Sequence, residues 1–180
     1  MHLLSTPRMQ MALVLLAVVG HILAADPEAP RIHGQQKLAT AADCSGAVGF
    51  SGVGTHQVHD TGLIGYRTTL VDRGVGFSRE TGEFTVHCPG IYHIAFAAYS
   101  NTPNTRIILK KRGAGKGSTW TEVASAGGEK SGGGSNQILL ELEVGDQTGV
   151  WLADRRVNIA TDNDRAAPST TFTAFRIAKK

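Results

Sequence analysis

From Cys44 onward, the chain is a succession of short runs in which apolar and polar residues alternate, each bounded by Gly, Asn, Asp or Pro. The clearest run places Tyr92, Ile94, Phe96 and Ala98 two residues apart. Side chains two apart lie on one face of a β-strand, so this spacing predicts strands with a buried face. No run gives a convincing helix or helical crossover, and the sheets are therefore expected to be mainly antiparallel.

About eight or nine such runs are present, separated by turn signals, which is typical of a sandwich or a barrel. The polar, Gly-rich segment Gly127–Ser135 is interpreted as a loop tip. The runs predicted as strands are 47–51, 63–70, 84–88, 92–98, 107–109, 119–124, 138–142, 150–152 and 170–177.

The N-terminus carries a separate signal. Met11–Ala24 is almost wholly apolar and is followed by small residues, which is typical of a signal peptide over residues 1–25. The alternative is a membrane anchor, but a spanning helix needs about 20 apolar residues, and this run is shorter and contains Gly20 and His21. We therefore expect a secreted, extracellular protein with no membrane span.

Residues 26–43 lack sustained periodicity and contain Pro27, Pro30 and Gly34, so we interpret them as a flexible N-terminal tail before a folded domain over residues 44–180. Residues 1–25 hold one of the 18 basic side chains and none of the 15 acidic ones, so the mature chain has a net charge of +2. That charge is too small to indicate a nucleic acid as partner.

Two cysteines, Cys44 and Cys88, are present. In an oxidising compartment, two thiols of one small domain are expected to pair. The alternative is that one or both bridge to a neighbouring subunit, and the sequence leaves this open.

Several polar clusters are candidate sites. Lys110, Lys111, Arg112 and Lys116 form a basic, Gly-rich turn that suits anionic glycans or lipopolysaccharide, with a solvated turn as the alternative. The same turn contains a sequence superficially like a phosphate loop (GAGKGST), but Gly117 separates Lys116 from Ser118 and no helix follows.

Metal and catalytic signals are weaker. The oxygen atoms of Asp162, Asn163 and Asp164 suit calcium, although a polar turn explains them equally, and no other cofactor is indicated. His56 and His59 lack a third ligand nearby. No nucleophile elbow or Cys-His arrangement occurs, so we do not expect an enzyme.

Eight residues stand at intervals that resemble the signature of the complement C1q globular-head domain. The signature has Phe where this chain has Tyr66 and Ile94, and the other six positions match. The residues are Tyr66, Asp72, Phe77, Phe84, Gly90, Tyr92, Ile94 and Phe96, at spacings of six, five, seven, six, two, two and two.

The flanks are similar to the same family. Val48–Ser51 resembles its first strand, Gly145-Asp146 followed by Val150-Trp151-Leu152 resembles a later stretch with a small insertion at 147–149, and Thr171–Phe175 resembles its last strand, including Phe172 and Phe175. In this interpretation the apolar signature residues are core, Gly90 meets a backbone requirement and Asp146 bonds turn amides.

The resemblance implies an all-β fold, an antiparallel jelly-roll β-sandwich of about ten strands, assembled as a homotrimer. It also implies a head-only member without a collagen stalk that binds microbial glycans, lipopolysaccharide or a cell-surface receptor in innate immunity, by multivalency. Two alternatives are a tumour-necrosis-like or cerebellin-like signalling ligand, and a matrix protein without a specific ligand. The residues that form the trimer interface are not identified by the sequence.

Overall fold

The computed structural model describes residues 44–74, 76–128, 130, 132–154, 159 and 168–180, all within one compact unit, Lys37–Lys180. The predicted signal peptide (1–25), the predicted tail (26–43) and the candidate calcium residues Asp162, Asn163 and Asp164 lie outside the described residues. Within those described ranges, no helix has the length and hydropathy needed to cross a bilayer.

The described residues form ten strands. Each is bounded by the turn residues that the sequence places between its apolar runs. They are β1 (Gly49–Val58), β2 (Ile64–Arg73), β3 (Gly76–Ser78), β4 (Glu83–Thr85), β5 (Gly90–Tyr99), β6 (Arg106–Arg112), β7 (Thr121–Gly127), β8 (Gly133–Leu142), β9 (Gln147–Leu152) and β10 (Thr171–Lys179).

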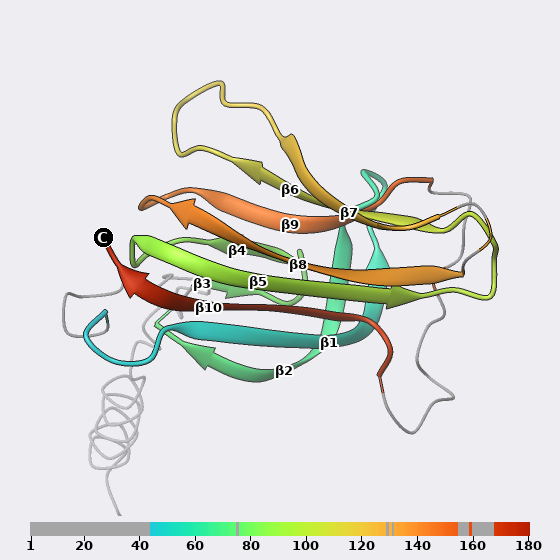
Figure 1. Ribbon diagram of the computed structural model, residues 1–180, viewed down its shortest axis with the longest axis horizontal. Coiled ribbons are helices and arrows are strands. Elements are labelled where there is room, and N and C mark those ends of the chain that lie inside the picture. The colour runs from blue at the N-terminus through green and yellow to red at the C-terminus, as the bar shows by residue number, and fades with distance from the viewer. Residues whose placement is uncertain (1–43, 75, 129, 131, 155–158, 160–167) are drawn as a thin grey trace, which may run out of the picture. The chain divides into compact units, whose positions relative to one another are not determined.

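The strands form two five-stranded sheets (Figure 1). Sheet A has the order β2-β1-β10-β5-β8, and sheet B has the order β3-β4-β9-β6-β7. Every pair of neighbours is antiparallel, and strands far apart in sequence, such as β1 and β10, are neighbours. This arrangement confirms the predicted antiparallel jelly-roll sandwich of about ten strands.

The core lies between the sheets and follows the period-two pattern. Tyr92, Ile94 and Phe96 on β5 are at most 1% exposed, whereas the residues between them are only partly buried. Phe50 stacks on Phe77 with ring centroids 4.1 Å apart. Each large side chain buried in this way contributes about 1.5–3 kcal/mol to folding.

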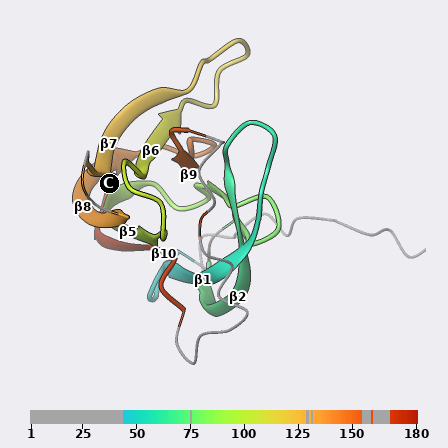
Figure 2. The same ribbon diagram turned by 90° about the vertical axis from the view of Figure 1, so that its right-hand side faces the viewer.

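The β1–β2 hairpin extends from sheet A to sheet B (Figure 2). Leu63, at its turn, forms an isolated bridge with Trp151 of β9, and the Leu152 amide donates to the Gly62 carbonyl at 2.8 Å. The hairpin therefore helps to join the two layers at one end of the sandwich.

Cys44 and Cys88 form a disulfide within the chain, and no free cysteine remains. Of the two pairings that the sequence left open, the structure therefore has the one within a single chain. The closed loop, with a sequence separation of 44 residues, is expected to stabilise the fold by about 4 kcal/mol. Arg176 supports the bridge by donating to the carbonyls of Cys44 and Pro89.

Strand limits differ from those predicted. Gly133–Ser135, expected in a loop tip, begins β8 and pairs with Ala97–Tyr99 of β5. β7 begins two residues later than predicted, at Thr121. Residues 147–149, predicted as an insertion, lie inside β9 in continuous register with Arg112–Lys110 of β6, so they lengthen a strand without interrupting it.

Candidate functional site

The outward face of sheet A carries a row of large side chains across three neighbouring strands. Phe175 of β10, His93 of β5 and Leu139 of β8 lie opposite one another in the register. Phe175 and Leu139 are 46% and 58% exposed, and the rings of His93 and Phe175 have centroids 5.0 Å apart. We define the apolar face as the outward odd-numbered residues 91–99 of β5, 171–175 of β10 and 135–139 of β8, where the large apolar side chains Ile91, Phe175 and Leu139 stand among small and uncharged polar ones.

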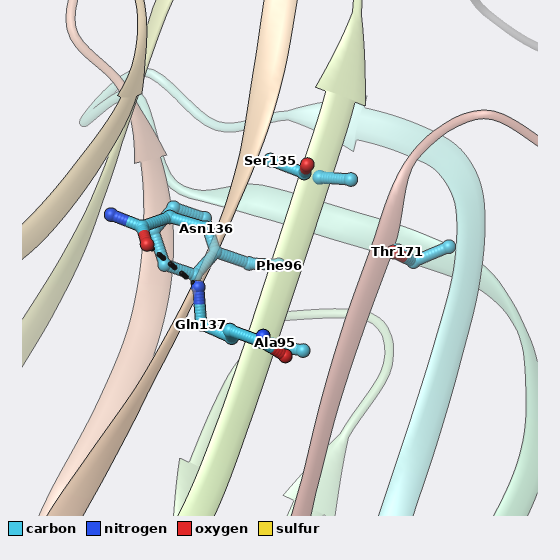
Figure 3. A pocket seen from close by; sticks show the side chains of 7 residues that line it. Ala95, Phe96, Ser135, Asn136, Gln137 and Thr171 are labelled. Atoms are coloured by element: carbon cyan, nitrogen blue, oxygen red, sulfur yellow. Dashed lines mark hydrogen bonds between the residues drawn. The ribbon is translucent and has the colours of Figure 1, made fainter.

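Short side chains form a hollow beside this row. Ala95, Ala97, Ser135, Gln137 and Thr171 line a space of about 510 Å³. Figure 3 shows Ala95, Ser135 and Thr171 around it, on three neighbouring strands. Because Ala95, Ala97, Ser135 and Thr171 are short, another surface can approach the backbone of sheet A closely here.

A second hollow lies towards β1 and β2. It has a volume of about 250 Å³, and its lining includes Val71, Thr173 and Phe175. Gly49 is part of it, and a Cβ atom there would lie 2.7 Å from the Ala174 carbonyl oxygen. Phe175 of the row thus lines this second hollow, whereas the first hollow reaches β10 at Thr171.

Charged side chains are absent from the positions that define the apolar face, and two of opposite sign stand on the edge strands of sheet A. Arg73, on edge strand β2, lies opposite Gly49. Glu141, on edge strand β8, forms an ion pair with Lys180 at 3.1 Å. Contiguous exposed apolar side chains are typical of protein-contact surfaces.

The cations predicted as an anion site lie on β6 of sheet B and in the turn that follows it. Lys111 is bound internally, because its Nζ lies 2.9 Å from the carboxylate of Asp146, which is 6% exposed. Asp146 also accepts from the Glu143 amide at 3.0 Å. Lys110 lies over the ring of Trp151, 5.5 Å from its centroid, and 3.7 Å from Glu122.

Arg112 and Lys116 differ in their surroundings. The Arg112 guanidinium lies 4.4 Å from the ring centroid of Trp120, donates to Gln147 and is 3.7 Å from Glu83. Lys116 is exposed in the turn after β6, where Ser118 donates to the Gly115 carbonyl at 2.7 Å. The structure thus brings these cations to one region of sheet B, with Lys111 turned to an internal partner.

The residues that resemble the family signature and its flanks have different places in the structure. Six of the signature's apolar residues, including Tyr66 and Phe84, are in the core or packed against it. Gly90 has a φ of +151°, and a Cβ atom there would lie 2.2 Å from the Ala178 carbonyl oxygen, so the position requires glycine. Gly145 has a φ of +85° in the turn before Asp146.

Two of the remaining family positions are exposed. Phe172 is fully buried, whereas Phe175 lies on the apolar face. Asp72 is exposed near the end of β2, where partial desolvation raises the pKa of its carboxyl and the charge of His87 opposes this shift.

Metal ligands do not gather in the described residues: no group of three or more His, Cys, Asp or Glu side chains suits a metal ion there. The Nε2 of His59 lies 2.9 Å from the Glu80 carbonyl oxygen, so this residue is engaged with the backbone.

The apolar face was not identified from the sequence. The signal that was available is on β5, where both sets of alternate positions lack charge from Gly90 to Tyr99. A strand of this kind is covered on both faces more often than on one. The period-two pattern identifies the inward set, but it does not say what covers the outward set.

The chain was compared with known families and solved structures. The family model of the C1q domain matches residues 49–177. Among solved structures, the globular domain of zebrafish complement 1qA protein is 21% identical, with a TM-score of 0.55, covering 75% of this chain and 100% of that one.

Two further structures share the fold at lower identity. Murine APRIL is 12% identical with a TM-score of 0.56, covering 73% of this chain and 100% of that one. Eiger TNF from S. frugiperda is 12% identical with a TM-score of 0.55, covering 74% of this chain and 94% of that one.

Proposed function

Because this chain belongs to the C1q domain family, we propose that it is a secreted recognition protein without enzymatic activity, which assembles as a homotrimer and binds anionic surfaces multivalently. Members of this family are generally extracellular recognition or signalling proteins. The disulfide between Cys44 and Cys88 supports an oxidising compartment.

The apolar face is the observation that carries this proposal. Covering Phe175 and Leu139 with a second copy removes apolar surface from water, at about 25 cal/mol per Å². Three copies related by a three-fold axis use two different parts of each subunit in every contact. The opposite charges of Arg73 and Glu141, on the two edge strands of sheet A, suit such a head-to-tail contact.

In such a trimer the cations of sheet B remain accessible, because they lie on the layer opposite the apolar face. Lys116, Lys110 and Arg112 are the groups that we propose for anionic glycans or the phosphates of lipopolysaccharide. Arg112 and Lys110 are held over Trp120 and Trp151, which orders their charges before binding. Lys111 is the weakest candidate of the four, because Asp146 already neutralises it.

Multivalency provides the affinity in this mechanism. A few partly neutralised cations bind one anionic group weakly. Three copies on one rigid body bind a repetitive surface about 10²–10⁴ times more tightly than one copy does.

The first test measures the absolute mass of the mature protein by light scattering, and then its binding to vesicles that contain lipopolysaccharide. We expect a trimer that survives reductant, and binding that is lost in Ala95→Glu, which places a charge in the hollow of the apolar face. The Lys110→Met/Lys116→Met variant should remain trimeric and bind at least tenfold more weakly. Lys179→Met is the matched control and should bind as the wild type does.

A monomer at all concentrations would contradict the multivalent mechanism. A trimer that ignores the vesicles and binds one host receptor saturably would contradict surface recognition and support the alternative of a tumour-necrosis-like or cerebellin-like ligand.

A further inference from the structure

A titratable side chain occupies the middle of the otherwise uncharged apolar face. His93 lies between Phe175 and Leu139 in the row that crosses sheet A. Histidine is the side chain whose charge ordinarily changes between pH 5 and 8. Its position therefore puts a group that can carry a charge among otherwise uncharged side chains.

The two ring nitrogens of His93 differ in their surroundings. Its Nε2 lies 3.2 Å from the side-chain carbonyl oxygen of Gln137, which can only accept, so Nε2 is the donor in this contact. Its Nδ1 is buried and has no hydrogen-bond partner among the described residues. A second proton would sit on Nδ1, where no acceptor stabilises it.

The strands around His93 supply no close acid. On β5 no residue from Gly90 to Tyr99 carries a fixed charge. On β8 the acid on the same face is Glu141, which lies opposite Ile91 and is paired with Lys180, the residue after β10. The charged residues of β10 are Arg176, which donates to two backbone carbonyls, and Lys179, opposite Gly90 at the end of the strand.

We propose that protonation of His93 opens the assembly, so that the subunits separate when the solution is acidified. The proposal rests on the trimer proposed above, in which a neighbouring subunit covers His93 beside Phe175. In the separated subunit, water solvates the charged imidazole; in the proposed trimer, the same charge would be withdrawn from water beside Phe175, and its own chain supplies no hydrogen-bond partner for Nδ1 among the described residues.

The direction of the pH effect follows from proton binding. The assembled state binds fewer protons at His93 than the separated subunits do, so the assembly is strongest above the range in which histidine titrates and weakens as the pH falls through it. With one His93 in each of three subunits, the dissociation constant rises by up to about a thousandfold for each pH unit.

Sedimentation velocity at a series of concentrations, at about pH 7.5 and about pH 5.5, tests the proposal across the range in which histidine titrates. We expect the wild type to be trimeric at the higher pH and to dissociate at the lower one, and to reassemble on return. His93→Gln keeps a polar group near Gln137 without a titratable charge and should remain trimeric at both values. His56→Gln changes an exposed histidine outside the apolar face and should dissociate as the wild type does.

Different results would contradict the proposed trimer and the proposed role of His93. A wild-type monomer at the higher pH contradicts the proposed trimer and this inference with it. A trimer that persists at the lower pH, or that is acid-sensitive in His93→Gln as well, contradicts the role of His93 alone.

A measurement on the wild-type protein avoids dependence on any variant's folding. The ring proton signals of His93, followed by NMR, should change over the same pH range as the dissociation. A His93 transition separated from the dissociation by more than about one pH unit overturns the proposal.

Discussion

Two buried tyrosines in the core differ in whether the hydroxyl has a partner. Tyr92 donates to the Cys88 carbonyl at 2.5 Å. Tyr66 is 1% exposed, and its hydroxyl has no hydrogen-bond partner among the described residues. The same chemical change, removal of one oxygen atom, should therefore have different effects at the two positions.

We expect Tyr92→Phe to lower the free energy of unfolding by about 1–3 kcal/mol, because it leaves the buried Cys88 carbonyl unpaired. Tyr66→Phe should be neutral or stabilising by up to about 1 kcal/mol, because it removes an unsatisfied buried hydroxyl. Urea unfolding of both variants measures the difference. Equal destabilisation by the two substitutions would contradict this assignment of partners.

The raised pKa of Tyr92 also leads to a prediction of how the free energy of unfolding depends on pH in the alkaline range. Burial raises its pKa from the ordinary value of 10.0 to about 12, and the charge of Arg176 opposes this shift. Since folding favours the neutral phenol, its contribution is fully present below about pH 10 and is lost as the pH rises towards 12. Between those pH values the unfolding free energy should fall more steeply in the wild type than in Tyr92→Phe, and parallel curves would show that Tyr92 does not titrate in this way.

At the scale of single residues, the sequence predicts which side chains are buried between the sheets, but it does not predict which outward side chains form an exposed apolar surface. Tyr92, Ile94 and Phe96 were expected to be buried, because their spacing and size both indicate a core. Phe175 has the same character, yet it points outward from β10. Composition does not separate a residue buried by folding from one that only a second subunit would bury.

Among the elements, the start of β5 is tightly constrained. Gly90 combines a positive φ with a close approach to the Ala178 carbonyl, whereas a Cβ atom at Gly115 would meet nothing within 4 Å. We expect Gly90→Ala to lower the free energy of unfolding by more than about 2 kcal/mol, because the added methyl group forces β5 and β10 apart.

Gly115→Ala is the matched control and should change stability by at most about 0.5 kcal/mol. Thermal unfolding of the two variants decides the point. If Gly90→Ala were as stable as Gly115→Ala, the end of β10 would have moved to accommodate the added methyl group without lowering the free energy of unfolding.

The sequence predicted nine of the ten strands but not the short β3 (Gly76–Ser78), and it predicted strand limits less well. Gly133 and Gly134 look like loop residues by composition, yet they continue β8 because Tyr99 and Ala98 pair with them across the sheet. Tertiary pairing overrides local propensity in such cases. The residues added at 147–149 keep β9 in register with β6, so they lengthen the strand as a strand and not as a loop.

For the whole molecule, the proposed trimer couples folding to association. Assembly stabilises the folded subunit by mass action, so the Tm should depend on protein concentration. A hundredfold increase should raise the Tm by about 5 °C, since the size of the subunit makes each kcal/mol equivalent to about 2–4 °C. Ala95→Glu should unfold at a temperature independent of concentration, and the same independence in the wild type would contradict obligate assembly.

The sequence predicted the fold of the whole domain because its signature residues specify the core and the turns together. It did not predict the apolar face, which depends on how β10, β5 and β8 are placed side by side by pairings between residues such as Phe175 and His93 that are 82 positions apart. It located the cations of β6, but the pairing of Lys111 with Asp146 needed three-dimensional coordinates.

The disulfide has a mechanical consequence. Cys44 precedes β1, and its bond leads to Cys88, immediately before β5, which lies between β10 and β8 in sheet A. A pulling force applied to the chain before Cys44 is therefore transmitted through the disulfide to β5, in the interior of sheet A, as well as to β1. Because the force does not act on β1 alone, the disulfide opposes the separation of β1 from β2 and β10.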